Sequence, residues 1–148
     1  MIFIGVGAVN GLGNTKGCAN APEKIAAFLD VKNFSSLKLN KDNVEEQEKQ
    51  IYESAKELIK NSKPIFLGGD HSLSYSTCKA FFQLYPQAKL IVFDAHPDCM
   101  PPMKEPTHEE WLRALIEREH IPSPKNNILL IGVRKIEAEE SKFMIEND

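Results

Sequence analysis

The sequence predicts one α/β domain with a parallel, doubly wound sheet. Short apolar runs such as Leu90 to Phe93 contain no alternating polar residue, which is typical of parallel strands buried on both faces. Strand-like and helix-like segments alternate along the chain, and this order favours parallel strands joined by crossover helices. A length of 148 residues fits a single domain, 1–148, that can bury a hydrophobic core.

The N-terminal strand, Ile2 to Ile4, leads into a glycine-rich loop from Gly5 to Gly13. Such loops can bind dinucleotides, but here the third glycine falls at Gly11, one residue late for that fingerprint. The strand-like run from Phe34 to Leu39 also lacks the acidic residue that would bind a ribose. The loop is therefore not expected to bind a nucleotide.

Three helices are expected before the Leu90 strand. Asn20 can cap the first, which has Pro22 in its first turn. Its apolar residues on one face are Ile25, Phe28 and Leu29. The second spans Asn43 to Asn61, and its apolar residues at helical spacing are Val44, Ile51, Ala55, Leu58 and Ile59. The third, from about Ser74 to Leu84, would be a crossover with Ala80, Phe81 and Leu84 pointing inward.

A fourth helix is expected after a rigid loop from Pro101 to Pro106. Thr107 and Glu110 have the spacing of a capping box, so the helix should start there and run toward Glu119. Its apolar residues on a common face are Trp111 and Leu115. His108 would lie in its first turn, and His120, at the far end, is given no chemistry. A strand from Asn127 to Val133 and a helix from Glu137 to Asn147 follow.

Three side chains that can bind a metal come directly after the Leu90 strand: Asp94, His96 and Asp98. Alternate side chains of an extended chain point the same way, so the three can converge beyond the strand end. Open α/β sheets bind their ligands at that edge. An imidazole between two carboxylates suits manganese, iron or zinc better than calcium or magnesium.

A second set of polar residues follows the apolar run from Pro64 to Leu67. Two glycines allow a tight turn there, and Asp70 and His71 come next. If the two strands were adjacent and parallel, His71 would lie beside Asp94 and Asp98.

These segments resemble the signature sequences of the ureohydrolases, the arginase and agmatinase family of binuclear manganese enzymes. The matching segments are Gly68 to Ser72, Asp94 to Asp98, Pro106 to Arg113, Leu130 to Arg134 and Ala21 to Ile25. The resemblance implies an arginase-like fold and a small guanidino or amidino substrate.

The resemblance also assigns roles to residues of this chain. It implies that His71, Asp94 and Asp98 hold one Mn²⁺, and that His96 with a bridging Asp94 holds the other. His108 would be the proton-shuttling histidine. We expect Asp70 to orient the His71 imidazole or its loop, because carboxylates commonly fix metal-bound histidines.

The chain departs from the family in lacking a later Asp-x-Asp pair after Asp98. One metal is therefore expected to bind well and the second poorly, and the chain to be a partial fold without the C-terminal strands. The leading hypothesis is a manganese-dependent hydrolase of a linear C–N bond. The alternative is a non-catalytic metal-binding or scaffolding fragment. A third hypothesis is a mononuclear deacetylase-type hydrolase. Such an enzyme shares the Asp-x-His sequence at the strand end, but it would also need a later Asp ligand that this sequence does not provide.

The amino-acid composition limits the expected binding partners and the expected cellular location of the protein. A net charge of −3 gives no reason to expect nucleic acid, and no apolar run is long enough for a membrane. Three widely spaced cysteines and no signal peptide favour the cytoplasm; Cys99 is either a buried thiol or a soft zinc ligand. In the arginine-specific members of the family that this chain resembles, Asn and Ser in the loop after the second motif bind the amino and carboxylate groups of the substrate. The loop here, Pro101 to Pro106, lacks both, so the resemblance disfavours arginine as substrate. A homo-oligomer is expected to cover the exposed sheet face.

Overall fold

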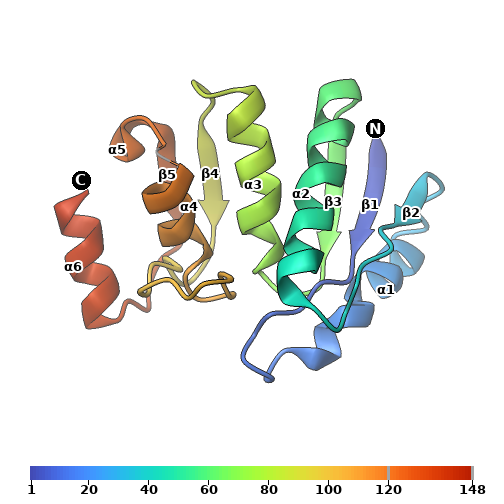
Figure 1. Cartoon of the computed structure of the whole chain (residues 1–148), viewed down its shortest axis with the longest axis horizontal. Coiled ribbons are helices and arrows are strands. Elements are labelled where there is room, and N and C mark those ends of the chain that lie inside the picture. The colour runs from blue at the N-terminus through green and yellow to red at the C-terminus, as the bar shows by residue number, and fades with distance from the viewer. Residues whose placement is uncertain (120, 148) are drawn as a thin grey trace.

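The computed structural model describes residues 1–119 and 121–147, and its strands form two parallel sheets (Figure 1). The first sheet has the order β2-β1-β3, and the second pairs β4 with β5. The strands are β1 (Ile2–Val6), β2 (Phe34–Ser36), β3 (Pro64–Gly68), β4 (Leu90–Phe93) and β5 (Ile128–Ile131). Ile4 is in register with Phe66 in the first sheet, and Val92 with Leu130 in the second. The α/β class and the parallel strands are thus confirmed.

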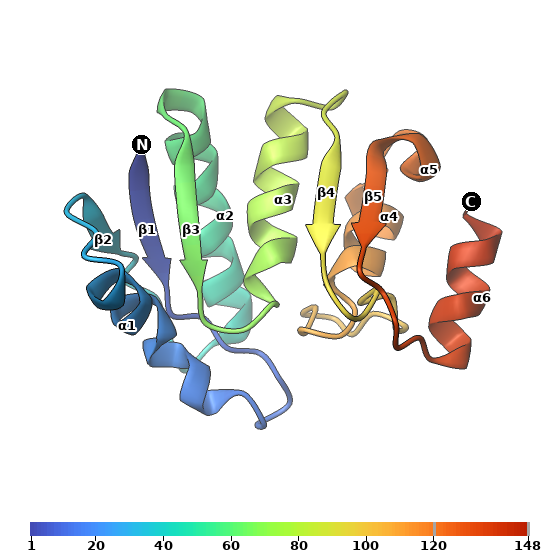
Figure 2. The same cartoon turned by 180° about the vertical axis from the view of Figure 1, so that it is seen from behind.

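Helices α2, α3 and α4 cover one face of the strands, and α1 lies on the opposite face beside β1 and β2 (Figures 1 and 2). The helical elements are η1 (Lys16–Asn20), α1 (Ala21–Phe28), α2 (Val44–Asn61), α3 (Leu73–Leu84), α4 (Trp111–Glu119), α5 (Pro124–Asn127) and α6 (Ala138–Glu146). His120 lies outside the described residues. Within 1–119 and 121–147, no helix has both the length and the apolar character needed to cross a bilayer.

The expectation that the strands before His71 and Asp94 are adjacent is wrong. β3 pairs with β1 and β4 pairs with β5, and the two strands belong to separate sheets. Both sheets nevertheless end on the same side of the molecule (Figure 2). Helix α3 connects β3 to β4 and packs against both α2 and α4, so helix packing sets the relative position of the two sheets.

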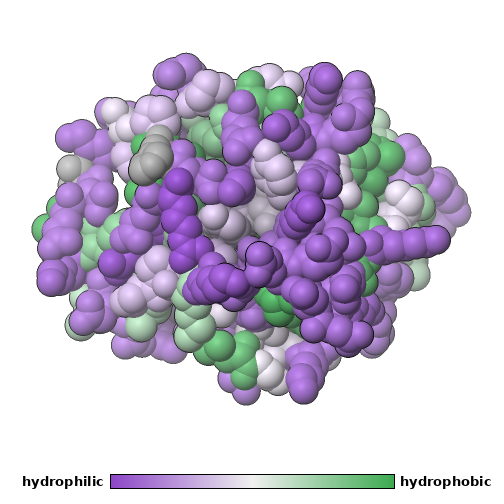
Figure 3. All heavy atoms as spheres, viewed as in Figure 1, coloured by the Kyte–Doolittle hydropathy of each residue, from purple (hydrophilic) through white to green (hydrophobic). Residues whose placement is uncertain are grey.

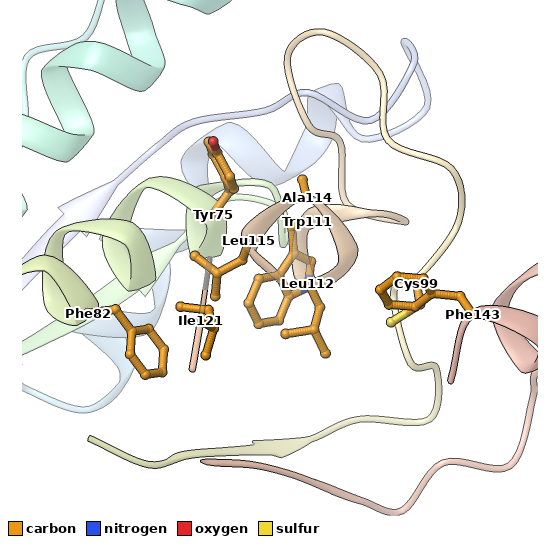
Figure 4. Packing of buried hydrophobic residues seen from close by; sticks show 9 residues of the cluster. All are labelled: Tyr75, Phe82, Cys99, Trp111, Leu112, Ala114, Leu115, Ile121 and Phe143. Carbon is orange, nitrogen blue, oxygen red and sulfur yellow. The ribbon is translucent and has the colours of Figure 1, made fainter. Parts of the chain in front are cut away.

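Each sheet has its own hydrophobic core. The core of the first sheet is formed by Ile4, Val6, Ala8, Ile51 and Leu73. The larger core lies between the second sheet and helices α3, α4 and α6 (Figure 4). Its buried residues are Tyr75, Phe82, Cys99, Trp111, Leu112, Ala114, Leu115, Ile121 and Phe143. The outer surface of the helices is largely hydrophilic (Figure 3).

The prediction that the Leu90 strand is buried on both faces is wrong. Ile91 is 56% exposed and Phe93 is 77% exposed, and Leu129 and Ile131 of β5 are exposed on the same alternation. The reason is that helices cover one face of this sheet and the strands are open on the other (Figure 2). An apolar run is typical of a parallel strand in a sheet that is covered on both faces, and helices cover only one face of β4 and β5.

The first three helices agree with the sequence in extent but not in every detail. The Asn43 side chain caps α2 by accepting a hydrogen bond from the Glu46 N–H at 3.0 Å. Asn20, in contrast, makes no side-chain cap bond, and the apolar face of α1 is exposed, with Phe28 at 88%. In α3, Ala80 is buried as expected, but Phe82 rather than Phe81 fills the core.

Glu48 is a partly buried carboxyl group on the inner side of α2. Its Oε1 is buried without a hydrogen-bond partner among the described residues. Burial, followed by repulsion from Glu105, raises the pKa of Glu48 to about 7, although Arg118 and Lys79 partly oppose this. A carboxyl whose pKa is raised on folding destabilises the fold as pH rises from its unfolded pKa to its folded pKa.

Replacing Glu48 by Gln should therefore raise the free energy of unfolding above pH 7 and leave it nearly unchanged below pH 4.5. We expect a gain of about 1–2 kcal/mol, since each pKa unit corresponds to about 1.4 kcal/mol and the group is partly screened by solvent. Urea unfolding at pH 4 and pH 8 measures this change in the free energy of unfolding. Glu53→Gln, at an exposed position of the same helix, is the control. A gain independent of pH would contradict this explanation.

Candidate metal centre

The turn after β3 directs His71 toward the second sheet. Gly69 allows this turn, because a Cβ at that position would lie 2.1 Å from the carbonyl oxygen of Ala8. Its N–H donates to the Val6 carbonyl at 2.8 Å, which holds the turn against the end of β1. Gly69 is therefore needed for the close approach of backbone to backbone, whereas a Cβ at Gly68 would meet the Leu73 side chain.

The turn after β4 carries Asp94, His96 and Asp98. The Asp94 N–H donates to the Ile131 carbonyl at 3.0 Å, which extends the pairing of β4 with β5 by one residue. The His96 N–H donates to Asp94 Oδ1 at 2.9 Å. Asp98 has a φ of +51°, a left-handed conformation that Asp adopts more readily than most residues.

His71 lies beside both carboxylates even though the two sheets are not paired. Its Nδ1 is 2.7 Å from Asp98 Oδ2 and 3.4 Å from Asp94 Oδ2. One ligand atom from each of the three residues lies within 4.8 Å of the others. The imidazole also packs on the Trp111 ring, with centroids 4.9 Å apart. One imidazole and two carboxylates at this spacing fit a divalent transition metal.

Asp98 is held by α4 through both its side chain and its backbone. The Trp111 indole N–H donates to Asp98 Oδ2 at 2.7 Å. The Asp98 carbonyl accepts from the N–H groups of Leu112 and Arg113, at 3.3 and 3.4 Å, which would otherwise be unsatisfied at the start of α4. The next N–H, of Cys99, donates to the buried Glu140 of α6 at 3.0 Å. The start of α4 therefore fixes Asp98 itself, and α6 fixes the residue that follows it.

His96 lies on the other side of Asp94 and is not part of the three-residue group. Its Nδ1 is 3.5 Å from Asp94 Oδ1, and its side chain is 50% exposed. Within the described residues, His71, Asp94 and Asp98 are the one group that could hold a metal ion, and His96 contacts only Asp94 of that group. The three-residue group fits an ion, and His96 with Asp94 is short of donors.

Local charges and burial shift the pKa of one donor, Asp94, and of its neighbour in the turn, Cys99. Burial tends to raise the pKa of Asp94, but the His96 N–H, the His71 imidazole and the Ala95 N–H hold it below its ordinary value. The Cys99 thiol is 2% exposed and donates to the Pro97 carbonyl at 3.2 Å. Burial raises the pKa of Cys99 to about 12, so the thiolate that a zinc ligand requires is disfavoured.

His108 lies at the same site, in the turn that precedes α4 rather than within the helix. Half of the expected capping box is present: the Thr107 N–H donates to Glu110 Oε1 at 3.0 Å, but the Thr107 hydroxyl donates to the Glu110 carboxylate and accepts from the Glu109 N–H at 3.3 Å. The His108 Nδ1 is buried with no hydrogen-bond partner among the described residues, while Nε2 is 3.6 Å from Glu109 Oε1. His108 lines a pocket of about 410 Å³. The other lining residues are His96, Asp98, Met100, Glu109, Lys135, Glu137 and Glu140.

Asp70 faces away from the metal ligands and toward the glycine-rich loop. One carboxylate oxygen accepts from the Asn10 N–H at 2.8 Å and from the Thr15 hydroxyl at 2.6 Å. The other accepts from the Ser72 N–H at 3.0 Å and from the Ser72 hydroxyl. Asp70 is 8% exposed, and it therefore acts on the loop that carries His71 rather than on the imidazole itself.

Comparison with known proteins gives the family. The family model described as Arginase family matches residues 1–148. The chain belongs to the arginase family. An arginase of Saccharomyces cerevisiae is 32% identical over 121 residues, which are 70% of this chain and 36% of that protein. An arginase of Staphylococcus aureus is 26% identical over 140 residues, or 84% and 46%.

The fold agrees with solved structures of the arginase family. The crystal structure of formimidoylglutamase from Bacillus subtilis aligns with a TM-score of 0.86 and 22% identity, over 99% of this chain and 52% of that one. The chain thus spans about half the length of the relatives that it matches, or less. The arginase-like α/β fold predicted from the sequence is confirmed.

Three polar contacts of this site were not predicted from the sequence: those of Trp111, Glu140 and Asn10. Trp111 was expected only as a core residue, and Glu140 only as part of a charged helix. The sequence signal for Trp111 is its position at the start of the first helix after the Asp94–Asp98 motif, because its indole has one N–H that needs an acceptor when buried.

Replacing His71 by Ala should reduce Mn²⁺ affinity at least about 100-fold, because one of three donors is lost. Titration calorimetry with MnCl₂ measures this. His108→Ala is the control and should leave affinity within about twofold, since His108 is not among the three donors. Equal affinity of the His71 variant and the unmodified protein would contradict the site.

Replacing Trp111 by Phe should keep most of the ring packing and remove the N–H that binds Asp98. We expect Mn²⁺ affinity to fall about 10–100-fold, the usual effect of removing a partner of a metal ligand. The control is Phe143→Leu, in the same core but without a bond to Asp98. If both variants lose affinity equally, the effect comes from core packing and not from the indole N–H.

Proposed function

We propose that this chain carries the metal-binding and proton-transfer residues of a manganese-dependent ureohydrolase. The reaction is hydrolysis of a linear C–N bond in a small guanidino or amidino compound. The observation that carries the proposal is the convergence of His71, Asp94 and Asp98, with His108 lining the pocket next to them. Membership of the arginase family supports the same reaction class.

The proposed ligands divide into a complete and an incomplete set. His71, Asp94 and Asp98 hold one Mn²⁺, and His96 with Asp94 contributes to a second. Bound ions of this kind supply Lewis acidity and a water-derived nucleophile at neutral pH. Because the second set has two protein donors, this chain holds one ion tightly and the second weakly. Donors equivalent to the Asp-x-Asp pair of the family would complete the second set.

His108 is the proposed proton carrier for the leaving amine. Its Nε2 side faces Glu109, whose carboxylate oxygen Oε1 lies 3.6 Å away. Its buried Nδ1 lacks a partner among the described residues, which favours keeping the proton on Nε2 in the neutral ring. Asp70 supports catalysis indirectly, by holding the loop that bears His71.

The pocket charges support a cationic substrate. Besides the proposed metal ligand Asp98, three carboxylates line the pocket against one lysine: Glu109, Glu137 and Glu140 with Lys135. A guanidinium or amidinium group is attracted by such a surplus of negative charge. Arginine itself is disfavoured, since the loop from Pro101 to Pro106 lacks the Asn and Ser that resemblance to arginine-specific members would require.

The second candidate is a non-catalytic metal-binding or scaffolding fragment. It is favoured by the single three-donor group within the described residues, since a binuclear centre needs more ligands than this. Metal content distinguishes the candidates at saturating Mn²⁺: two ions per chain support the enzyme, and one or none the fragment.

The chain is proposed to act as one domain, 1–148, in the cytoplasm and as a homo-oligomer. Its three cysteines are free, as is usual in a reducing compartment. The exposed side chains of β4 and β5 form an apolar surface that self-association would cover. Light scattering tests the oligomer.

The reaction is tested by urea or amine release from arginine, agmatine, guanidinobutyrate and formiminoglutamate at saturating Mn²⁺. His108→Ala should lower turnover about 10²–10⁴-fold with unchanged metal content, and added imidazole should restore part of it. No turnover of any of the four compounds by protein loaded with two ions would overturn the enzyme proposal.

A further inference from the structure

The loop before His108 is held by side chains that bind four consecutive carbonyl groups. Arg118 of α4 donates to the carbonyls of Met103 and Lys104, the latter at 2.8 Å. Asn10 donates from its side-chain amide to the carbonyls of Glu105 and Pro106, both at 3.1 Å. Each hydrogen of the Asn10 amide group thus has its own acceptor.

Arg118 and Asn10 reach this loop from different parts of the fold. Arg118 belongs to the helix that directly follows His108, so its bonds are local to the second sheet. Asn10 comes from the loop after β1 in the first sheet, 95 residues before Glu105. Asn10 therefore fixes the loop relative to the other sheet, and Arg118 fixes it relative to α4.

The backbone of Asn10 binds the other half of the centre. Its N–H donates to Asp70 Oδ2 at 2.8 Å, and Asp70 directly precedes His71. The Asp70 N–H returns to the Ala8 carbonyl at 3.1 Å, so the two loops are joined in both directions. One residue thus binds the loop of His71 through its backbone and the loop of His108 through its side chain.

A second contact joins the loop before His108 to α2, but it is weaker than the bonds of Asn10. Lys104 Nζ is 2.8 Å from Glu45 Oε2 of α2, but both side chains are largely exposed. Exposed ion pairs contribute little to the position of a loop, since water competes for both charges. The bonds of Asn10 are partly buried and end two residues before His108 at the nearest, so they bear more directly on its position.

From this arrangement we propose that Asn10 is a positioning residue that sets the separation between the metal-binding strand ends and His108. The inference rests on the proposed role of His108 in proton transfer. The Asn10 side chain affects turnover only through His108. The bond to Asp70 uses the Asn10 backbone N–H, so it survives any replacement of the side chain except proline.

Two variants test the side chain. Asn10→Ala removes both donors, and Asn10→Asp keeps the shape but turns donors into acceptors that face two carbonyl oxygens. Asn10→Ser, a polar but shorter side chain, replaces either variant that fails to fold by circular dichroism. We expect turnover to fall about 10–100-fold, because small misplacement of a reacting group costs about 10². Mn²⁺ affinity should stay within about twofold.

The control is Asn33→Ala. Asn33 also donates its amide to a backbone carbonyl, that of Met1 at 3.1 Å, but at an exposed position away from the centre. It should leave turnover and metal affinity unchanged. A loss equal to that of Asn10→Ala would mean that any such bond has the same effect, and would overturn the positioning role.

A double-mutant cycle separates positioning from general stability. In His108→Ala, adding Asn10→Ala should lower turnover by less than about twofold, because the residue through which Asn10 acts is already gone. A structural role would give the full loss in both backgrounds, and this result would overturn the proposal. Loss of metal in Asn10→Ala alone would also overturn it.

A readout that does not depend on turnover keeps the inference testable if the enzyme proposal fails. Amide hydrogen exchange over residues 103–108 should become faster in Asn10→Ala and not in Asn33→Ala. The His108 imidazole signal in NMR spectra should shift in the same variant. Unchanged exchange and an unchanged signal would refute the positioning role, whereas absent turnover with both changes would refute the proposed function alone.

Discussion

The site depends on the contact between His71 and Asp98, because it joins two sheets that share no strand pairing. His71 follows β3 of one sheet, and Asp98 follows β4 of the other. Their side chains meet at 2.7 Å, and Trp111 binds the same carboxylate oxygen and packs on the same imidazole. The indole therefore orients both partners. An ion among these donors would attract both carboxylates that otherwise repel each other across the imidazole.

The exposed strand face follows from an incomplete layer rather than from unusual residues. β4 and β5 place apolar side chains on both faces, but α4 covers one face and the strands are open on the other (Figure 2). Ile91 and Phe93 therefore contact solvent with side chains typical of a buried parallel strand. The matched relatives are about twice as long as this chain.

Local patterns in the sequence were sufficient for the element order and for the convergence of His71, Asp94 and Asp98. The convergence was predicted correctly for an incomplete reason: the strands end at one edge, but α3 packing rather than adjacent pairing brings them together. The bonds of Asn10 could not be predicted, because its acceptors lie 95 and 96 residues away in a loop without regular structure. Long-range contacts from a loop leave no periodic signal in a sequence.

Asp94 divides its two carboxylate oxygens between the two histidines of the site. Oδ2 lies 3.4 Å from His71 Nδ1, while Oδ1 lies 3.5 Å from His96 Nδ1 and accepts the His96 N–H. In the proposed centre, Asp94 could therefore contribute one oxygen to each of the two donor sets. The two sides still differ, because Asp98 adds a second carboxylate only on the His71 side. If the proposed second ion binds on the His96 side, charge rather than the orientation of Asp94 would make that side the weaker one, and further carboxylates would be needed to hold a dication beside the first.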